Sequence, residues 1–134
     1  MTNIIKINHV AVAVEDIDTA LSFWRDALGI PLHHIEDVPS QKARVAFLPV
    51  GDSEVELVQP TAEDTGTAKF IKERGGGIHH LCIQVGDIDA ALKDLKAKGV
   101  RLINESALEL EGRRMAFVHP KSTGGVLLEL YQLT

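Results

Sequence analysis

Apolar and polar residues alternate in two well-separated segments of the chain, near residues 5–14 and near residues 78–85. In the first segment His9 and two alanines share one face, and three valines share the other. Alternation of this kind predicts a β-strand, because successive side chains of a strand point to opposite faces. We therefore expect a similar strand at the start of each half of the chain.

Helical periodicity follows each of these strands. Apolar residues at intervals of three and four predict one helix that starts at Asp16 or Asp18, either of which can cap it, and stops at Gly29. A second helix is predicted from Asp87 to Gly99 on the same grounds. The apolar stripes contain Ile17, Ala20, Leu21, Trp24 and Leu28 in the first helix and Ile88, Ala91, Leu92 and Leu95 in the second.

Three short apolar or alternating runs, bounded by Gly, Pro and Asp, follow each helix and predict strands. They lie near residues 31–38, 43–50 and 53–59 in the first half, and near residues 101–104, 113–119 and 125–132 in the second. Each half therefore has the predicted order β-α-β-β-β. The segment between the halves begins as a loop, contains a short predicted helix near 68–74 and ends in three glycines.

The two halves are copies of one another. Residues 7–21, INHVAVAVEDIDTAL, match residues 78–92, IHHLCIQVGDIDAAL, at eight of fifteen positions. Later in each half, VELVQ at 55–59 matches LELYQ at 128–132. The offset between the copies drifts from 70 to 73 residues, as small loop insertions would cause.

The duplication predicts the architecture. We expect one α+β domain over residues 1–134, built from two tandem βαβββ modules related by pseudo-two-fold symmetry. Module 1 covers about residues 5–62, a connector covers about 63–77, and module 2 covers about 78–134. A module of this size buries only a modest fraction of its surface when alone, so the two modules are expected to form one structure.

Two polar pairs occupy matching strand positions in the two modules: His9 with His80, and Glu56 with Glu129. A buried carboxylate without a partner is costly, so these groups must face solvent or compensate one another around a cation. Two imidazoles and two carboxylates suit a divalent first-row metal ion. A single strand His is more often structural and a single strand Glu more often solvated, but their recurrence in both copies favours a shared metal site between the modules.

Composition and charge narrow the class of function. Lys and Arg total 14 against 19 Asp and Glu, a net charge of −5, which leaves no basic surface for nucleic acid or an anionic membrane. No apolar run approaches the roughly 20 residues of a membrane-spanning helix. The single cysteine, Cys82, cannot form an internal disulfide and is expected to be a packed core thiol, and the N-terminal segment lacks the features of a signal peptide. We expect a cytoplasmic protein.

The sequence resembles the vicinal oxygen chelate (glyoxalase/bleomycin resistance/dioxygenase) superfamily and, within it, the methylmalonyl-CoA epimerases. The resemblance runs essentially end to end, from INHVAVAVEDIDTALSFWRDALG through VAFLPVGDSEVELVQP to FVHPKSTGGVLLELYQ. The stretches GGIHHLCI and HPKSTGGVLLEL are the most particular to the epimerases. The fold of the superfamily by itself would be a loose guide to activity, because it hosts several chemistries.

The resemblance implies a ligand set and a cofactor. His9, His80 and Glu129 take metal-ligand positions of the family, and Glu56 falls where one member has a Gln ligand, so it is expected to be the fourth ligand. The expected cofactor is a divalent ion, with cobalt favoured by the resemblance and zinc, manganese or nickel also compatible with these donors. The resemblance also implies an acyl-CoA substrate and a homodimer. His33 and His34 are adjacent, so a strand would turn them to opposite faces, and we assign them a surface or dimer-contact role on that ground.

The implied reaction is epimerisation of methylmalonyl-CoA at C2, in propionyl-CoA metabolism. A carboxylate removes the C2 proton, the metal stabilises the enolate as a Lewis acid, and a proton returns to the opposite face. Glu129 is the first candidate for one acid/base. A related epimerase carries its second catalytic Glu at or near the position of Val45, so Glu56 is the leading candidate here, with water or Glu36 as alternatives.

Other functions remain open on the sequence. A lactoylglutathione lyase would also suit two His and two Glu ligands, and a ligand- or drug-binding protein of the same fold would need no metal. An extradiol dioxygenase fits less well, because its usual ligands leave Glu56 unexplained. Contacts to the CoA moiety cannot be separated from solvated surface charge among the candidates Lys42, Arg44, Arg113, Arg114 and Lys121.

Overall fold

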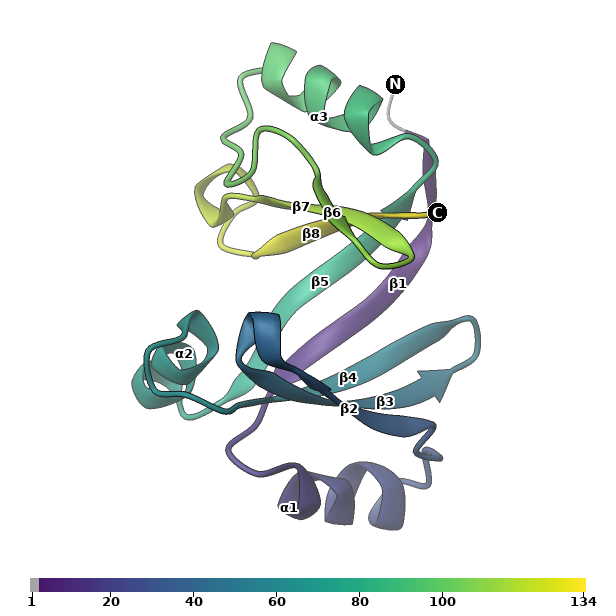
Figure 1. Cartoon of the computed structure of the whole chain (residues 1–134), viewed down its shortest axis with the longest axis vertical. Coiled ribbons are helices and arrows are strands. Elements are labelled where there is room, and N and C mark those ends of the chain that lie inside the picture. Colours follow the sequence, from purple (N-terminus) through teal and green to yellow (C-terminus); the bar gives the residue numbers. More distant parts are fainter. Residues whose placement is uncertain (1–2) are drawn as a thin grey trace. The chain divides into compact units, whose positions relative to one another are not determined.

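The computed structural model describes residues 3–134, which divide into two compact units (Figure 1). Unit 1 joins residues 3–8 to His80–Thr134, and unit 2 is the continuous stretch His9–His79. Strands β1 (Ile4–Ala13) and β5 (Gly77–Val85) contribute residues to both units. The boundary between the units therefore falls inside two strands.

Unit 2 contains four strands in the order β2-β3-β4-β1. Strand β2 (His34–Val38) pairs antiparallel with β3 (Ala43–Val50), which pairs antiparallel with β4 (Ser53–Pro60), and β4 pairs parallel with β1. The helical elements are α1 (Ile17–Leu21), a π-helix at Ser22–Ala27, a 3₁₀ turn at Pro39–Gln41 and α2 (Gly66–Arg74).

Unit 1 repeats this plan with the order β5-β8-β7-β6. Strand β5 pairs parallel with β8 (Leu128–Leu133), and β8 pairs antiparallel with β7 (Arg113–Val118), which pairs antiparallel with β6 (Leu108–Leu110). Helix α3 (Ile88–Ala97) follows β5, and a 3₁₀ turn lies at Pro120–Ser122. Each unit thus contains the β-α-β-β-β order that the sequence predicts.

Each unit has its own apolar core between the sheet and the helix that follows its first strand. The buried core of unit 2 consists of Val12, Ile17, Leu21, Ala46, Leu48 and Leu57, and that of unit 1 consists of Val85, Ile88, Ala91, Leu92, Ala116, Val118 and Leu130. Because side chains alternate along a strand, Leu57 faces this core while its neighbour Glu56 lies on the other face of the sheet. Leu130 and Glu129 divide in the same way.

Both core helices start at a matched pair of caps. The Asp16 carboxylate accepts the Thr19 N–H at 2.9 Å, and the Asp87 carboxylate accepts the Ala90 N–H at 3.1 Å, so Asp16 and not Asp18 caps the first helix. The first N–H of each helix is also satisfied. The N–H of Ile17 donates to Oε1 of Gln59, and the N–H of Ile88 donates to Oε1 of Gln132.

The first helix differs from the prediction of one regular α-helix. After α1 the chain forms a π-helix, in which the N–H of Leu28 donates to the carbonyl of Phe23, five residues earlier. This wider turn rotates the following residues, so Leu28, predicted on the apolar stripe, is 55% exposed. The prediction for Leu28 was therefore wrong because the stripe assumed a constant helical period.

The strand predicted near residues 101–104 was also wrong. Only Leu102 forms an isolated antiparallel bridge there, with Val118, and the regular ladder with β7 is made by β6, six residues later. The residues around the bridge still hydrogen-bond to β7 and its end, as in the bond from the N–H of Ile103 to the carbonyl of Phe117. No helix in residues 3–134 is both long and apolar enough to cross a bilayer.

Candidate active site

One His–Glu pair lies on the face of the unit 2 sheet opposite the α1 core. Nδ1 of His9 is 3.1 Å from Oε2 of Glu56, with the His9 side chain 1% exposed and the Glu56 side chain 13% exposed. In the parallel pairing of β1 with β4, Glu56 lies opposite Ala11, two residues after His9 on the same face. The two strands therefore bring an imidazole and a carboxylate into contact across one step of the ladder.

A second pair has the same construction in unit 1. Nε2 of His80 is 3.1 Å from Oε1 of Glu129, and both side chains are largely buried, at 13% and 7% exposure. In the pairing of β5 with β8, Glu129 lies opposite Cys82, two residues after His80. The duplicated residues thus occupy the same register position in both units, and each predicted His meets the predicted Glu of its own copy.

The chemistry of these pairs fits a divalent metal ion. Imidazole nitrogens and carboxylate oxygens are both ligands for first-row divalent metals, and here they converge in pairs on a protected face. The pairs differ in one detail, because His9 turns Nδ1 toward its carboxylate while His80 turns Nε2. Each unit therefore presents one imidazole nitrogen and one carboxylate, and both groups are suitable metal ligands.

Each Glu has an aromatic ring as its neighbour on the next strand. Phe47 lies opposite Glu56 and Phe117 lies opposite Glu129 in the strand ladders. The Phe117 ring meets the His80 ring edge-on, with centroids 5.6 Å apart. These two phenylalanines occupy matching positions of the repeat, which is the signal from which the sequence could have placed them beside the site.

The face of unit 2 continues from Phe47 to β2. The His34 ring stacks on Phe47 with centroids 4.4 Å apart, and Nδ1 of His33 lies 2.5 Å from Nδ1 of His34. Both histidines are exposed, as expected, but they do not point to opposite faces, because β2 begins only at His34 and His33 precedes the extended segment. The strand pairing places His34 on the same face of the sheet as Glu56.

The position of Val45 is apolar and closed. Val45 is 5% exposed and lies between Glu36 on β2 and Val58 on β4. Glu36 is exposed and occupies the row next to that of His34 and Phe47. Two strands, β3 and β4, therefore separate Glu36 from β1 and His9, whereas Glu56 lies on β4, directly beside β1.

The turn before β8 holds a histidine with a lowered pKa. Nδ1 of His119 accepts the N–H of Lys121 at 3.0 Å. Partial burial lowers the pKa of His119 below its usual 6.5, and the positive charges of Arg101 and Lys121 lower it further. The neutral imidazole of His119 is therefore the form that accepts this hydrogen bond and stabilises the turn.

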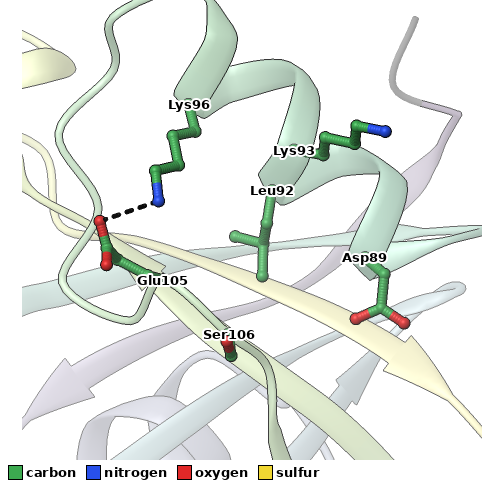
Figure 2. Close-up of a pocket in the computed structure, with 6 residues that line it drawn as sticks. All are labelled: Asp89, Leu92, Lys93, Lys96, Glu105 and Ser106. Atoms are coloured by element: carbon green, nitrogen blue, oxygen red, sulfur yellow. Dashed lines mark ion pairs between the residues drawn. The ribbon is translucent and has the colours of Figure 1, made fainter.

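A surface pocket in unit 1 lies apart from the His80–Glu129 pair. Figure 2 shows that its lining comes from α3 and from the loop before β6. Its lining residues are Asp89, Leu92, Lys93, Lys96, Glu105 and Ser106. Nζ of Lys96 and Oε1 of Glu105 form an exposed ion pair at 3.4 Å. The pocket contains no His–carboxylate pair and is a solvated hollow on the helix side of the unit.

Comparison with known families matches residues 8–117 to the glyoxalase/bleomycin resistance protein/dioxygenase superfamily. The chain belongs to this superfamily. Its α+β fold with the superfamily's paired modules was predicted from the repeat and is confirmed.

Relatives within the superfamily include methylmalonyl-CoA epimerases, which confirms the resemblance. The mitochondrial methylmalonyl-CoA epimerase of Mus musculus is 42% identical over 129 residues, which cover 95% of this chain and 72% of the mouse protein. The solved structure of methylmalonyl-CoA epimerase from Mycobacterium tuberculosis is 37% identical, with a TM-score of 0.91 over 100% of this chain and 91% of that chain.

A third relative has been solved with a bound ligand. A variant of Streptomyces coelicolor methylmalonyl-CoA epimerase in complex with 2-nitronate-propionyl-CoA is 32% identical to this chain. The match covers 98% of this chain and 96% of that chain, with a TM-score of 0.88. Solved structures similar to this chain thus include an epimerase with a bound acyl-CoA analogue.

Proposed function

We propose that the protein is a methylmalonyl-CoA epimerase, an isomerase that interconverts the R and S epimers at C2 in propionyl-CoA metabolism. The observation that carries the proposal is the His–Glu pair built at the same register position of both units. The end-to-end similarity to methylmalonyl-CoA epimerases supports the choice of substrate. The reaction needs proton removal beside two carbonyl groups, for which carboxylates are suitable bases.

The proposed metal ligands are His9, Glu56, His80 and Glu129, which together would hold one divalent ion. The ion, when bound, supplies Lewis-acid stabilisation of the negative charge that develops on the substrate oxygens. Cobalt is the proposed ion by family resemblance, and zinc, manganese and nickel accept the same donors. The burial of both pairs supports the ligand set, since a carboxylate in a protected site requires a positive partner.

Glu129 and Glu56 are the proposed acid/base residues. The Glu129 carboxylate takes the proton as the C2–H bond breaks, and the electron pair of that bond moves into the carbonyl system. A protonated Glu56 then returns a proton to the opposite face of C2, and the roles reverse for the other epimer. His9 and His80 orient the two carboxylates through their contacts at 3.1 Å.

Deuterium exchange tests the reaction. The purified protein, loaded with a divalent ion and incubated with methylmalonyl-CoA in deuterium oxide, should incorporate deuterium at C2. The absence of exchange in metal-loaded protein would refute the proposal. Turnover of the hemithioacetal of glutathione and methylglyoxal would instead identify a lactoylglutathione lyase, and folded protein without affinity for divalent ions would favour a ligand-binding role.

A pair of neighbouring histidines tests the ligand set. His80→Ala should abolish metal binding and exchange while the protein stays folded. His79→Ala is the matched control, because His79 precedes His80 in β5 and its ring contacts Phe70 of α2, with centroids 5.2 Å apart. Retention of full activity in His80→Ala would show that the ligand assignment is wrong.

The proposed assembly is a homodimer in the cytoplasm. Among the described residues, β2 and β6 are the outer strands of their units, and such edges are common sites of association. Isoleucines 4, 5 and 7 of β1 are also 58%, 53% and 46% exposed. Light scattering during size-exclusion chromatography would measure the mass, and a monomer at micromolar concentration would contradict the proposed assembly.

A further inference from the structure

Arg113 is a partly buried arginine without a carboxylate partner in the described part of the chain. Its Nε is buried and has no hydrogen-bond partner, and its guanidinium lies over the Tyr131 ring, with the central carbon 5.5 Å from the ring centroid. The adjacent Arg114 is the opposite case, because it bonds to Asp89 at 2.8 and 2.9 Å and to Glu109 at 2.6 Å. Unsatisfied buried polar atoms are rare in native proteins and call for a specific cause.

Arg113 lies on the face of the sheet that carries the candidate site. In the ladder between β7 and β8, Phe117 is opposite Glu129, Met115 is opposite Tyr131 and Arg113 is opposite Leu133. Residues two apart share a face, so Arg113, Tyr131 and Glu129 all project to the same side. Arg114 projects to the other side, toward Asp89 at the start of α3.

Arg113 lies two steps of the ladder from Glu129, because it is opposite Leu133, and its guanidinium extends over Tyr131, which lies between them on that face. Because Arg113 folds back over Tyr131, its charged end is beside a residue two positions from Glu129, which is a separation of about 7 Å along a strand. The surrounding side chains are apolar or aromatic, with Met115 3% exposed. A cation in such surroundings gains most from an anion that brings two oxygens, since guanidinium and carboxylate match as a bidentate pair.

We propose that Arg113 binds the free carboxylate of the acyl-CoA substrate and so selects carboxylated acyl groups. This inference rests on the proposed function, in which Glu129 acts at C2. The carboxylate is bonded to C2 and must therefore lie within a few bonds of the atom on which Glu129 acts. The phosphates of CoA are the other anionic source, but the whole pantetheine arm separates them from C2, which places them outside the reach of a group next to Tyr131.

The test compares wild-type protein with Arg113→Met and Arg113→Lys. Methionine keeps the apolar stem that contacts Tyr131, and because Nε of Arg113 has no partner to lose, Arg113→Met should fold with an unchanged or higher melting temperature. Its KM for methylmalonyl-CoA should rise by about tenfold or more, the loss expected for a charge-assisted hydrogen bond, and Arg113→Lys should recover part of it.

Two further ligands distinguish recognition of the substrate carboxylate from recognition of the CoA phosphates. Propionyl-CoA has the phosphates and lacks the carboxylate, so its inhibition constant should be the same for wild type and Arg113→Met. Methylmalonyl-pantetheine has the carboxylate and lacks the CoA nucleotide, so the variant should still bind it more weakly than wild type does. A loss confined to ligands with phosphates, or no loss with any ligand, would overturn the proposal.

Calorimetry separates this inference from the epimerase proposal, because binding needs no turnover. Wild-type protein should prefer malonyl-CoA to acetyl-CoA, and Arg113→Met should lose that preference even if C2 exchange were never observed. Arg114→Met is the matched control, since Arg114 forms its hydrogen bonds on the face of the sheet opposite the candidate site. It should lower the melting temperature through the loss of its Asp89 and Glu109 bonds and leave the preference unchanged.

Discussion

Gln59 and Gln132 connect the candidate site to the helices on the other side of the sheet. Each lies three residues after a site carboxylate, Glu56 or Glu129, and an odd spacing puts it on the opposite face of the same strand. Its side-chain oxygen accepts the N–H of Ile17 at 2.9 Å or of Ile88 at 2.8 Å. The repeated motif Glu-Leu-x-Gln therefore positions a site residue and a helix start with one strand.

Loss of this amide should weaken the fold. Gln132→Ala leaves the first N–H of α3 without its partner, which should lower the free energy of unfolding by about 1–2 kcal/mol. Gln132→Glu keeps an acceptor oxygen at the helix start and should lose less. Urea denaturation measures both differences, and we expect the dependence of the unfolding free energy on urea concentration to be unchanged. Equal stability of the alanine variant and wild type would show that the bond contributes nothing.

His119 should make stability depend on pH. Its pKa in the folded protein is below 6.5, so as the pH falls below 6.5 the unfolded chain takes up a proton before the folded chain does. The stabilising contribution is therefore complete above pH 6.5 and declines between 6.5 and the folded pKa. His119→Asn removes this titration and should flatten the decline in urea midpoint between pH 7.5 and pH 5. An identical decline in the variant would assign it to other groups.

The sequence could not distinguish Arg113 from Arg114. Both are cations in an alternating strand, and either could have been a solvated surface charge or a ligand contact. Their roles depend on which face each occupies, and that is decided by the register with β8 and by the carboxylates of α3 and β6. The four repeated His and Glu residues could be selected as candidate site residues from the sequence, because each recurs at the same strand position in both copies.

Comparison of the two copies explains the π-helix at Ser22–Ala27. Ile17 aligns with Ile88 at an offset of 71, but Gly29 aligns with Gly99 at an offset of 70, so the first copy has one more residue within this stretch. A hydrogen bond to the fifth preceding residue, from Leu28 to Phe23, accommodates the extra residue within a turn. The change of offset was visible in the sequence, whereas its location in a wide helical turn was not.

Removal of one residue should convert this segment to a regular α-helix. Deletion of the exposed Asp26 gives the first copy the spacing of the second, so the protein should fold with little loss of stability. Deletion of the exposed Lys93 from α3 is the matched control. It rotates Leu95 and the rest of the apolar stripe away from the core, which should cost about 2–5 kcal/mol. Hydrogen exchange and urea denaturation compare the two, and equal losses would contradict the assignment of an inserted residue.

At the scale of the whole molecule, the duplication predicted the element order and the recurrence of one His and one Glu at matching strand positions of each copy. It did so because a fixed spacing between repeats constrains both copies at once. The division into units was not predictable in this way, since it falls within β1 and β5, strands that read as continuous alternating segments. Periodicity identifies a strand but does not indicate which partner each part of it contacts.

Metal stoichiometry tests the proposed use of both copies. If the pairs His9–Glu56 and His80–Glu129 bind one ion together, elemental analysis should find one divalent ion per chain, and either His9→Ala or His80→Ala should lose it. Chelation should also lower the melting temperature of wild type, because an ion that binds only the folded state stabilises it. Two ions per chain, with each variant retaining one, would show that the pairs act separately.

The split of β1 affects how a newly made chain can fold. Unit 2 is continuous and is complete once His79 has left the ribosome, whereas residues 3–8 belong with a segment that begins at His80. Asn8 donates to Gln84 and Gly86 donates to Asn3, so these bonds must wait for later synthesis, which proceeds at about 5–20 residues per second. During that interval the first half of β1 has no strand of unit 1 to join. We therefore expect this segment to be the point at which two nascent chains would exchange strands.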